Sequence, residues 1–207
     1  MIIIGLTGSV GMGKTEAGKY FKRKNIDVFD CDKEIASLYK KELVLKQLKK
    51  FFPGVVINGS VNKIALARIV FSDKNKLKRL QNILYNLLEK KQSFWIRKKI
   101  REKKRIVVLD VPLLLESNNL KKYDLIVVVS SSKSIQRKRV LERKNWDSER
   151  LAKVLEKQIT DKEKVKLANV VIKTDRGKRY LYNAIIKTKK MVKIRTDRPV
   201  NNILKEF

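Results

Sequence analysis

The sequence predicts a three-layer α/β fold, in which a parallel sheet of five strands is covered by helices on both faces. Five short apolar runs alternate with longer stretches of helical spacing: residues 2–6, 26–30, 106–110, 125–129 and 170–172. Continuous apolar runs are typical of strands buried on both faces, and helical connections are typical of parallel sheets. A glycine-rich turn directly after the first run is the third observation.

The helical stretches follow the strands in order. Apolar residues at helical spacing predict helices over residues 14–24, 33–50, 134–167 and 177–191. Phe52-Pro53-Gly54 breaks the second of these patterns, and Asn58-Gly59 indicates a turn. From residue 62 to residue 100 the helical pattern continues without a strand, which is too long for a plain crossover. We interpret this stretch as a helical insertion.

Composition excludes several classes of protein. A chain of 207 residues with 43% hydrophobic residues fits one domain with a real core, so disorder is excluded as the main interpretation. One cysteine allows no internal disulfide, and the absence of histidine excludes His-based zinc sites and Ser-His-Asp triads. The first residues are unlike a signal peptide, and no apolar run approaches the roughly 18 to 20 residues of a membrane helix. We therefore expect a cytoplasmic protein.

The chain is strongly basic, with 51 Lys and Arg against 21 Asp and Glu and a net charge of +30. The basic residues punctuate the whole chain in short runs, and no aromatic stripe is interleaved with them. A solvated, lysine-biased surface is the favoured interpretation, and a functional surface for polyanions is the alternative. In either case the positive electrostatic field of the protein would speed the association of small anionic substrates.

The glycine-rich turn is a phosphate-binding motif. Gly8–Thr15 reads Gly-Ser-Val-Gly-Met-Gly-Lys-Thr, which matches G-x-x-x-x-G-K-[ST] and stands between a predicted strand and a predicted helix. In such a loop, backbone N–H groups and the helix N-terminus face a phosphate chain. Lys14 is expected to reach the β and γ phosphates, and the Thr15 hydroxyl to hold Mg²⁺. The motif indicates nucleotide binding, but it does not distinguish kinases from GTPases or motor ATPases. The alternative is a chance glycine-rich turn that only connects the strand to the helix.

An acidic corner, Asp30-Cys31-Asp32, follows the second predicted strand. If this segment is extended, Asp30 and Asp32 project to the same side, at the strand end where ligands of open α/β sheets bind. A carboxylate there can take or orient a hydroxyl proton for attack on a γ-phosphate. The alternative is that either residue caps the next helix, and sequence logic alone leaves the two interpretations even. An acid pair beside a phosphate loop, in a chain of net charge +30, favours the functional interpretation.

Asp110 ends the third predicted strand, where an Asp commonly belongs to the magnesium shell of phosphate-loop enzymes. An ordinary strand-end turn residue is the alternative. No Glu follows Asp110, and the chain has no Asn-Lys-x-Asp guanine signature. Both absences favour a small-molecule kinase.

Two arginines, Arg139 and Arg143, stand four residues apart in the predicted helix 134–167 and would share a face. Two guanidinium groups on one face can clamp a migrating phosphoryl group. A solvated basic face is the alternative interpretation, and it is common in this chain.

Together these motifs resemble the dephospho-CoA kinase family. The phosphate loop matches the family's opening, Asp30-Cys31-Asp32 matches its Asp-Ala-Asp, and residues 110–116 read Asp-Val-Pro-Leu-Leu-Leu-Glu against its Asp-Val-Pro-Leu-Leu-Phe-Glu. Gln136, Arg139 and Arg143 match its Gln-x-x-Arg-x-x-x-Arg helix, and residues 168–172 are similar to its Ala-Asp-x-Val-Ile strand. The matches run in order from residue 1 to about residue 177.

The resemblance implies a P-loop kinase fold with a nucleotide core, a helical CoA-binding insertion and a lid. The core would take about residues 1–60, 105–135 and 165–207, the insertion about 61–104 and the lid about 136–164. The implied reaction moves the γ-phosphate of ATP, with Mg²⁺, to the ribose 3′-hydroxyl of dephospho-CoA, the last step of CoA biosynthesis. The implied partners are these small molecules, with no specific nucleic acid and no membrane, for a monomer or weak homo-oligomer.

The resemblance also implies roles for individual residues. Asp32, Lys14 and Arg139 would be catalytic, and Thr15 and Asp110 would hold the metal. The ATP site would comprise Gly8, Gly11, Met12, Gly13, Lys14, Thr15, Glu16 and Arg143. The acceptor would meet Asp32, Tyr85, Pro112 and Leu113.

The sequence departs from the family at three places. Glu16 replaces a Ser or Thr, and its like charge predicts weaker nucleotide binding. Tyr85-Asn86 replaces His-Pro, so a phenol stands where the family has an imidazole, and Lys173-Thr174 replaces Asp-Asn. Two rival functions remain open at this point: a kinase for another nucleotide or hydroxyl acceptor, and a basic, nucleotide-gated nucleic-acid-binding module.

Overall fold

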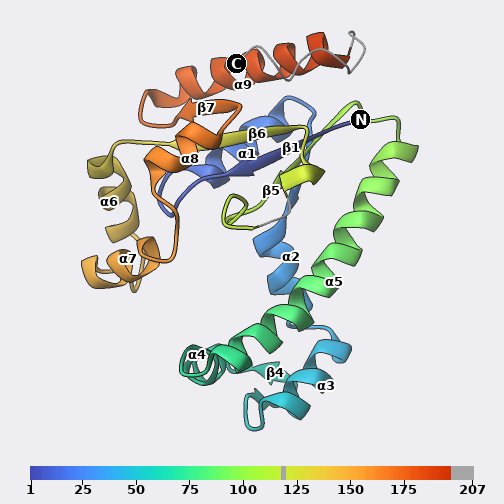
Figure 1. Cartoon of the computed structure of the whole chain (residues 1–207), viewed down its shortest axis with the longest axis vertical. Coiled ribbons are helices and arrows are strands. Elements are labelled where there is room, and N and C mark those ends of the chain that lie inside the picture. The colour runs from blue at the N-terminus through green and yellow to red at the C-terminus, as the bar shows by residue number, and fades with distance from the viewer. Residues whose placement is uncertain (118–119, 197–207) are drawn as a thin grey trace. The chain divides into compact units, whose positions relative to one another are not determined.

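The computed structural model describes residues 1–117 and 120–196, with side chains up to residue 192 (Figure 1). The chain divides into two compact units. Unit 1 comprises residues 1–29 and the chain from Lys103 onward, and unit 2 comprises residues 30–102. Each unit has a hydrophobic core of its own.

Unit 1 is built on a parallel sheet, with strands in the order β2-β5-β1-β6-β7. Their bounds are β1 Ile2–Thr7, β2 Asp27–Asp30, β5 Ile106–Asp110, β6 Leu125–Ser130 and β7 Val170–Lys173. Strand β1 is central: Ile4 lies beside Val108 on one side and Leu125 on the other. Every residue of β5 and β6 is buried, as continuous apolar runs predict. The predicted five-stranded parallel sheet is confirmed.

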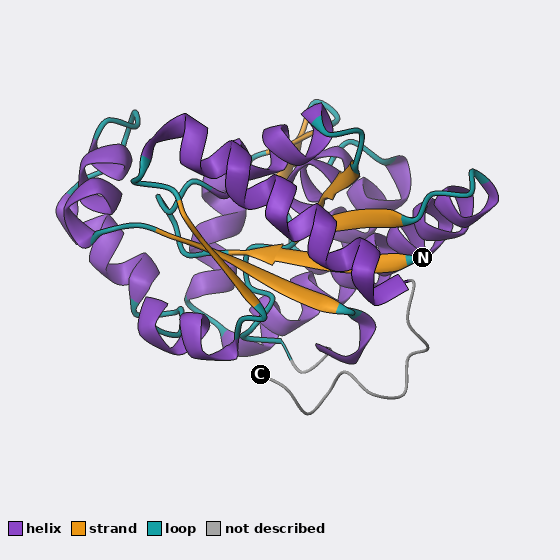
Figure 2. Ribbon diagram, turned by 90° about the horizontal axis from the view of Figure 1, so that it is seen from above, coloured by secondary structure: helices purple, strands orange, loops and turns teal. Residues whose placement is uncertain are grey.

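Helices cover both faces of this sheet (Figure 2). Alternate residues of β6 belong to different cores: Val127 and Val129 pack with α1 (Lys14–Arg23) and α9 (Gly177–Thr196). Ile126 and Val128 pack with the segment after β5 and with Ala168, which follows α8 (Asp161–Leu167). The remaining elements of unit 1 are the short η1 (Leu120–Lys122), α6 (Lys133–Leu141) and α7 (Ser148–Leu155).

Unit 2 contains four helices, α2 Cys31–Leu38, α3 Glu42–Phe51, α4 Lys63–Phe71 and α5 Lys74–Arg101. Asn62 caps α4 and Asp73 caps α5, each through a side-chain oxygen that accepts backbone N–H groups. Between α3 and α4, β3 (Val56–Ile57) and β4 (Ser60–Val61) form a hairpin around Asn58-Gly59, both with positive φ. The predicted turn is confirmed, while its two short strands were not predicted.

Two predicted helices are each interrupted. The stretch 33–50 forms α2 and α3, which are separated at residues 39–41. The stretch 134–167 forms α6, α7 and α8, because Asn145 adopts a left-handed conformation (φ 61°) and both Asp147 and Thr160 begin new helices as N-caps. In the described part of the chain, no helix is sufficiently long and apolar to span a membrane.

Candidate active site

The phosphate loop, Gly8–Thr15, joins the end of β1 to the start of α1 as the sequence predicts. Gly11 and Gly13 have φ angles of 79° and 89°, a backbone conformation that residues with a side chain rarely adopt. A Cβ on Gly11 would also lie 2.6 Å from a Val140 methyl and 2.9 Å from the Gln136 carbonyl oxygen. The motif therefore needs glycine at this position both for backbone conformation and for the close approach of α6.

Polar groups of three residues hold the loop from outside. The Gln136 side-chain amide donates to the Val10 carbonyl (2.8 Å), and the Thr174 hydroxyl donates to the Met12 carbonyl (2.7 Å). The Ser131 N–H donates to the Met12 sulfur (3.1 Å). Because these carbonyls are turned outward to α6 and to the segment after β7, the loop is preorganised before any ligand binds.

Lys14 and Asp110 form an ion pair at the end of β5. Asp110 is only 5% exposed, and Lys14 is the first residue of α1. Thr15 follows Lys14 in the first turn of α1 and is exposed. Glu16, the departure from the family pattern, pairs at 3.3 Å with exposed Lys19 and donates its N–H to the Gly13 carbonyl (3.1 Å).

Thr15 and Asp110 offer one hydroxyl and one carboxylate as possible metal ligands. Among the described residues there is no group of three or more His, Cys, Asp or Glu side chains that could hold an ion by themselves. Mg²⁺ commonly binds through one or two protein oxygens, waters and substrate phosphates. This donor set therefore fits a magnesium ion that arrives with a nucleotide.

Arg139 is anchored beside the phosphate loop. Its guanidinium donates to the Thr174 hydroxyl (2.9 Å) and to the Thr174 carbonyl (2.8 Å). Thr174 is thus shared between Arg139 and Met12 of the loop, a role that local sequence patterns did not reveal because the partners are far apart in the chain.

The prediction that Arg139 and Arg143 share a helix face is wrong. Helix α6 ends at Leu141, and Arg143 lies in the following turn, where its N–H donates to the Val140 carbonyl (3.0 Å). The exposed Arg143 guanidinium lies 5.9 Å from the centre of the Trp146 ring.

In unit 2, the acidic corner separates into two different roles. The Asp30 carboxylate accepts the Lys33 N–H (3.0 Å) and caps α2. Asp32 lies in the first turn of α2 and is exposed, so the two residues do not share an extended segment as the sequence suggested. Helix α2 is fixed to α5 by Lys91, whose ammonium pairs with Glu34 at 2.5 Å, and by a contact of 3.1 Å from the Gln92 amide to the Cys31 sulfur.

The remaining predicted residues are divided between the units. Tyr85 lies on α5 in unit 2 and is 50% exposed. In unit 1, the Pro112 carbonyl accepts the Thr7 hydroxyl (3.1 Å), and Leu113 is exposed. Unit 1 therefore contains the phosphate loop, Asp110, Arg139, Arg143, Pro112 and Leu113, and unit 2 contains Asp32 and Tyr85.

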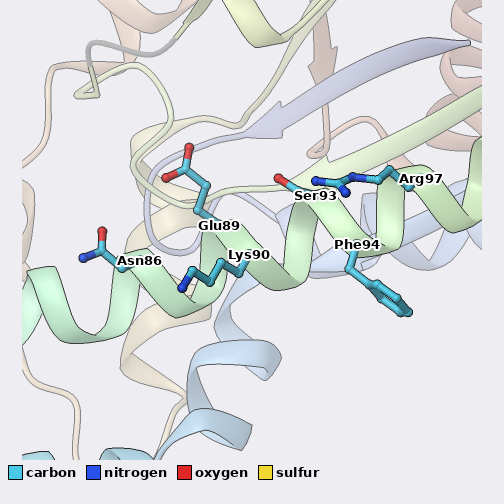
Figure 3. A pocket seen from close by; sticks show the side chains of 6 residues that line it. All are labelled: Asn86, Glu89, Lys90, Ser93, Phe94 and Arg97. Atoms are coloured by element: carbon cyan, nitrogen blue, oxygen red, sulfur yellow. The ribbon is translucent and has the colours of Figure 1, made fainter.

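Two open hollows of unit 2 contain neither Asp32 nor Tyr85. One, of about 550 Å³, is lined entirely by side chains of α5 (Figure 3): Asn86, Glu89, Lys90, Ser93, Phe94 and Arg97. Another, of about 510 Å³, lies between α3 and α5 and has Asn86 and Lys90 in common with the first. In Figure 3 the side chains of Lys90 and Phe94 point to one side of α5 and that of Glu89 to the other. Neither hollow gathers a set of reactive groups.

Comparison with known proteins decides the family. The family model for dephospho-CoA kinase matches residues 2–179. A dephospho-CoA kinase from Bartonella quintana is 40% identical over 152 residues, which cover 73% of this chain and 78% of that protein. The chain belongs to the dephospho-CoA kinase family. A family member from Nitrobacter winogradskyi is 36% identical over 151 residues, covering 73% of this chain and 75% of that protein.

Solved structures agree with the fold of the family. The crystal structure of TT1252 from Thermus thermophilus has a TM-score of 0.81 and 27% identity, and the match covers 92% of this chain and 96% of that one. A dephospho-CoA kinase from Campylobacter jejuni has a TM-score of 0.69 at 20% identity, covering 94% and 98% of the two chains. At that identity the second match supports the P-loop kinase fold alone.

Proposed function

We propose that this protein transfers the γ-phosphoryl group of ATP to the ribose 3′-hydroxyl of dephospho-CoA, giving CoA and ADP. The observation that carries the proposal is the braced phosphate loop with its Lys14–Asp110 pair, in a chain of the dephospho-CoA kinase family. A loop that is already curled loses little conformational entropy when a triphosphate binds.

The nucleotide's phosphates are bound by Gly8, Gly11, Met12, Gly13, Lys14, Thr15 and Glu16. Inward-facing N–H groups and the start of α1 supply the electrostatic attraction, and the Lys14 ammonium moves from Asp110 to the β and γ phosphates. Glu16 takes part through its backbone, because its carboxylate would repel the ligand.

Mg²⁺ would be held by the Thr15 hydroxyl and, directly or through water, by Asp110. When bound, the ion neutralises phosphate charge. Asp110 is suited to this role because its carboxylate is buried at the end of β5 and is already paired with a cation.

The acceptor hydroxyl is oriented by Asp32, which takes or directs its proton as the bond to phosphorus forms. Exposure of Asp32 on the first turn of α2 supports access by a ligand. Tyr85, Pro112 and Leu113 contribute further contacts to the acceptor.

Arg139 and Arg143 stabilise the charge of the migrating group, and residues 136–164 act as a lid. The contact of Arg139 with Thr174, which also holds Met12 of the loop, supports a place for Arg139 near the phosphates. We assign the nucleotide core to about residues 1–60, 105–135 and 165–207 and the CoA-binding insertion to about 61–104. The protein would work in the cytoplasm as a monomer or weak homo-oligomer, without specific nucleic acid or a membrane.

The test is ADP release from ATP, measured with and without dephospho-CoA. ADP should appear only with this acceptor, and Asp32→Asn should lower kcat by about 100-fold or more. Asp30→Asn is the matched control: Asn caps helices as well as Asp, so stability and kcat should stay close to those of the parent protein. Turnover of a nucleoside monophosphate but not of dephospho-CoA would refute the proposal.

A further inference from the structure

One face of α2 extends from Asp32 to Tyr39, the residue that ends the helix. Asp32, Ala36 and Tyr39 are spaced i, i+4 and i+7, so they lie in one row along the helix. Asp32 and Ala36 are exposed and Tyr39 is half-buried. The rise per residue places Tyr39 about 10 Å along the axis from Asp32. A ligand held at Asp32 can therefore extend over the small side chain of Ala36 toward Tyr39.

Tyr85, which comes from α5, lies near enough to Tyr39 to act on it electrostatically. Burial raises the pKa of Tyr39, and the nearby Tyr85 phenol raises that pKa further. In the described part of the chain, neither phenol hydroxyl has a hydrogen-bond partner from another residue. Both phenol hydroxyls are hydrogen-bond donors and therefore remain available to a ligand.

A cation completes the cluster. The Lys63 ammonium lies 5.7 Å from the centre of the Tyr39 ring, and its side chain is exposed at the start of α4. The three donors come from three elements of unit 2, the end of α2, the start of α4 and the middle of α5. Helices α2 and α4 both pack on α5 (Figure 1). Two hydroxyl donors and one ammonium are a set suited to phosphate oxygens.

The distance of the cluster from Asp32 is fixed by packing inside unit 2. Lys91 on α5 pairs with Glu34 and donates to the Ser37 hydroxyl (2.9 Å), and Gln92 contacts Cys31. These contacts hold α2 against α5 at Cys31, Glu34 and Ser37.

We propose that Tyr39, Tyr85 and Lys63 form a subsite for the diphosphate of the acceptor. The inference rests on the proposed function, because Asp32 orients the ribose 3′-hydroxyl, and the diphosphate of dephospho-CoA is attached to the 5′-oxygen of the same ribose. Tyr39 and Lys63 thereby determine specificity for an acceptor with a diphosphate over a bare nucleoside.

The test measures the Kd of dephospho-CoA by calorimetry. Tyr39→Phe and Lys63→Gln should each weaken binding about tenfold, as expected for loss of one donor to a charged group. The KM for ATP should not change. Binding of adenosine, which lacks the diphosphate, should be the same in the parent and both variants.

Matched controls are available in the same chain. Lys74→Gln removes a lysine at the start of α5, another capped helix of unit 2, and Tyr180→Phe removes a phenol whose ring lies near a cation in unit 1. Both controls should bind dephospho-CoA like the parent.

Three outcomes would overturn the inference. Unchanged Kd values for Tyr39→Phe and Lys63→Gln would refute the subsite, and equal weakening for adenosine would place the contact on the nucleoside. If Tyr39→Phe binds dephospho-CoA with full affinity while Tyr39→Leu loses affinity, the Tyr39 ring stacks on the ligand and its hydroxyl donates no hydrogen bond. If the parent shows acceptor-dependent ADP release in any of these cases, the proposed function survives; if the parent neither binds nor turns over dephospho-CoA, both fail.

Discussion

At the scale of single residues, two aspartates in one short segment occupy different positions. Asp30 uses its carboxylate to cap α2, while Asp32 lies two residues later on the exposed first turn. For each aspartate, the local sequence alone fits a helix cap and a catalytic carboxylate equally well, because N-caps and strand-end acids occupy the same kind of position. Backbone conformation at the start of α2 distinguishes them: the capping residue is extended, and the next residues are helical.

Tyr39 gives a residue-scale prediction about pH. Its pKa is raised in the folded protein by burial and by Tyr85, and in the unfolded chain it has its ordinary value of 10.0. Below that value both states keep the proton and the contribution to stability is complete. As pH rises above it, the unfolded chain loses its proton first, so stability falls until the folded pKa is passed. Urea unfolding at about pH 9 and pH 11 should show a smaller loss for Tyr39→Phe than for the parent; an equal loss would contradict the assignment.

Thr174 shows what residue patterns cannot provide. The sequence identified Lys173-Thr174 only as a departure from the family pattern. Its hydroxyl holds the Met12 carbonyl, and it accepts Arg139, contacts that join segments widely separated in the chain. The local sequence around a threonine after a strand does not indicate such a role. The order of the strands in the sheet, and not the spacing of residues in the sequence, brings its hydrogen-bond partners to it.

At the scale of elements, the attachment of α8 depends on a buried ion pair. Lys164 is fully buried, and its ammonium lies 2.7 Å from the Glu116 carboxylate, whose side chain is 15% exposed. Glu116 also accepts the Ile159 N–H (3.2 Å), so it joins the segment after β5 to the start of α8. The Asp161 carboxylate accepts the Ser130 hydroxyl from β6 (2.7 Å) and supports the same attachment.

Lys164→Met should therefore destabilise the protein by about 3 kcal/mol, because it leaves the Glu116 charge buried without its partner. The double variant Lys164→Met, Glu116→Leu should recover much of this loss. Lys153→Met is the control, since its pair with Glu149 is exposed and should contribute well under about 1 kcal/mol. The free energy of unfolding is measured for each variant, together with amide exchange in α8. If Lys164→Met loses no more unfolding free energy than Lys153→Met, the Lys164–Glu116 pair does not attach α8.

The elements were predictable where the apolar period was long and uninterrupted. All five strands of the sheet and the start of α1 are where the sequence placed them, because buried parallel strands are continuous apolar runs. The breaks inside 134–167 were missed although Asp147 and the capping box of Thr160 and Glu163 mark new helices, because surrounding charged residues are strong helix formers. The break at residues 39–41 has no glycine or proline to indicate it.

At the scale of the whole molecule, the chain divides its predicted chemistry between two units. Phosphate binding is proposed for unit 1, where contacts connect the loop to Asp110 and, through Thr174, to Arg139. Acceptor binding is proposed mainly for unit 2, where Asp32 and the tyrosine pair lie. Composition could not predict this division, because the boundary falls between Phe29 and Asp30, inside the continuous run of β2.

The net charge of +30 also belongs to this scale. The described basic residues occur on helices of both units, in loops and on β7, and many are exposed. A field of this sign attracts both ATP and an acceptor with a diphosphate, which is consistent with a kinase of two anionic substrates.

The site of the transferred phosphate identifies the reaction that this chain catalyses. The protein is incubated with ATP and dephospho-CoA, and the product is analysed by phosphorus NMR and mass spectrometry. We expect CoA in an amount equal to the ADP formed, with a monoester on the ribose 3′-oxygen. ADP accompanied by inorganic phosphate and unchanged acceptor, or a phosphate at another position, would contradict this expectation.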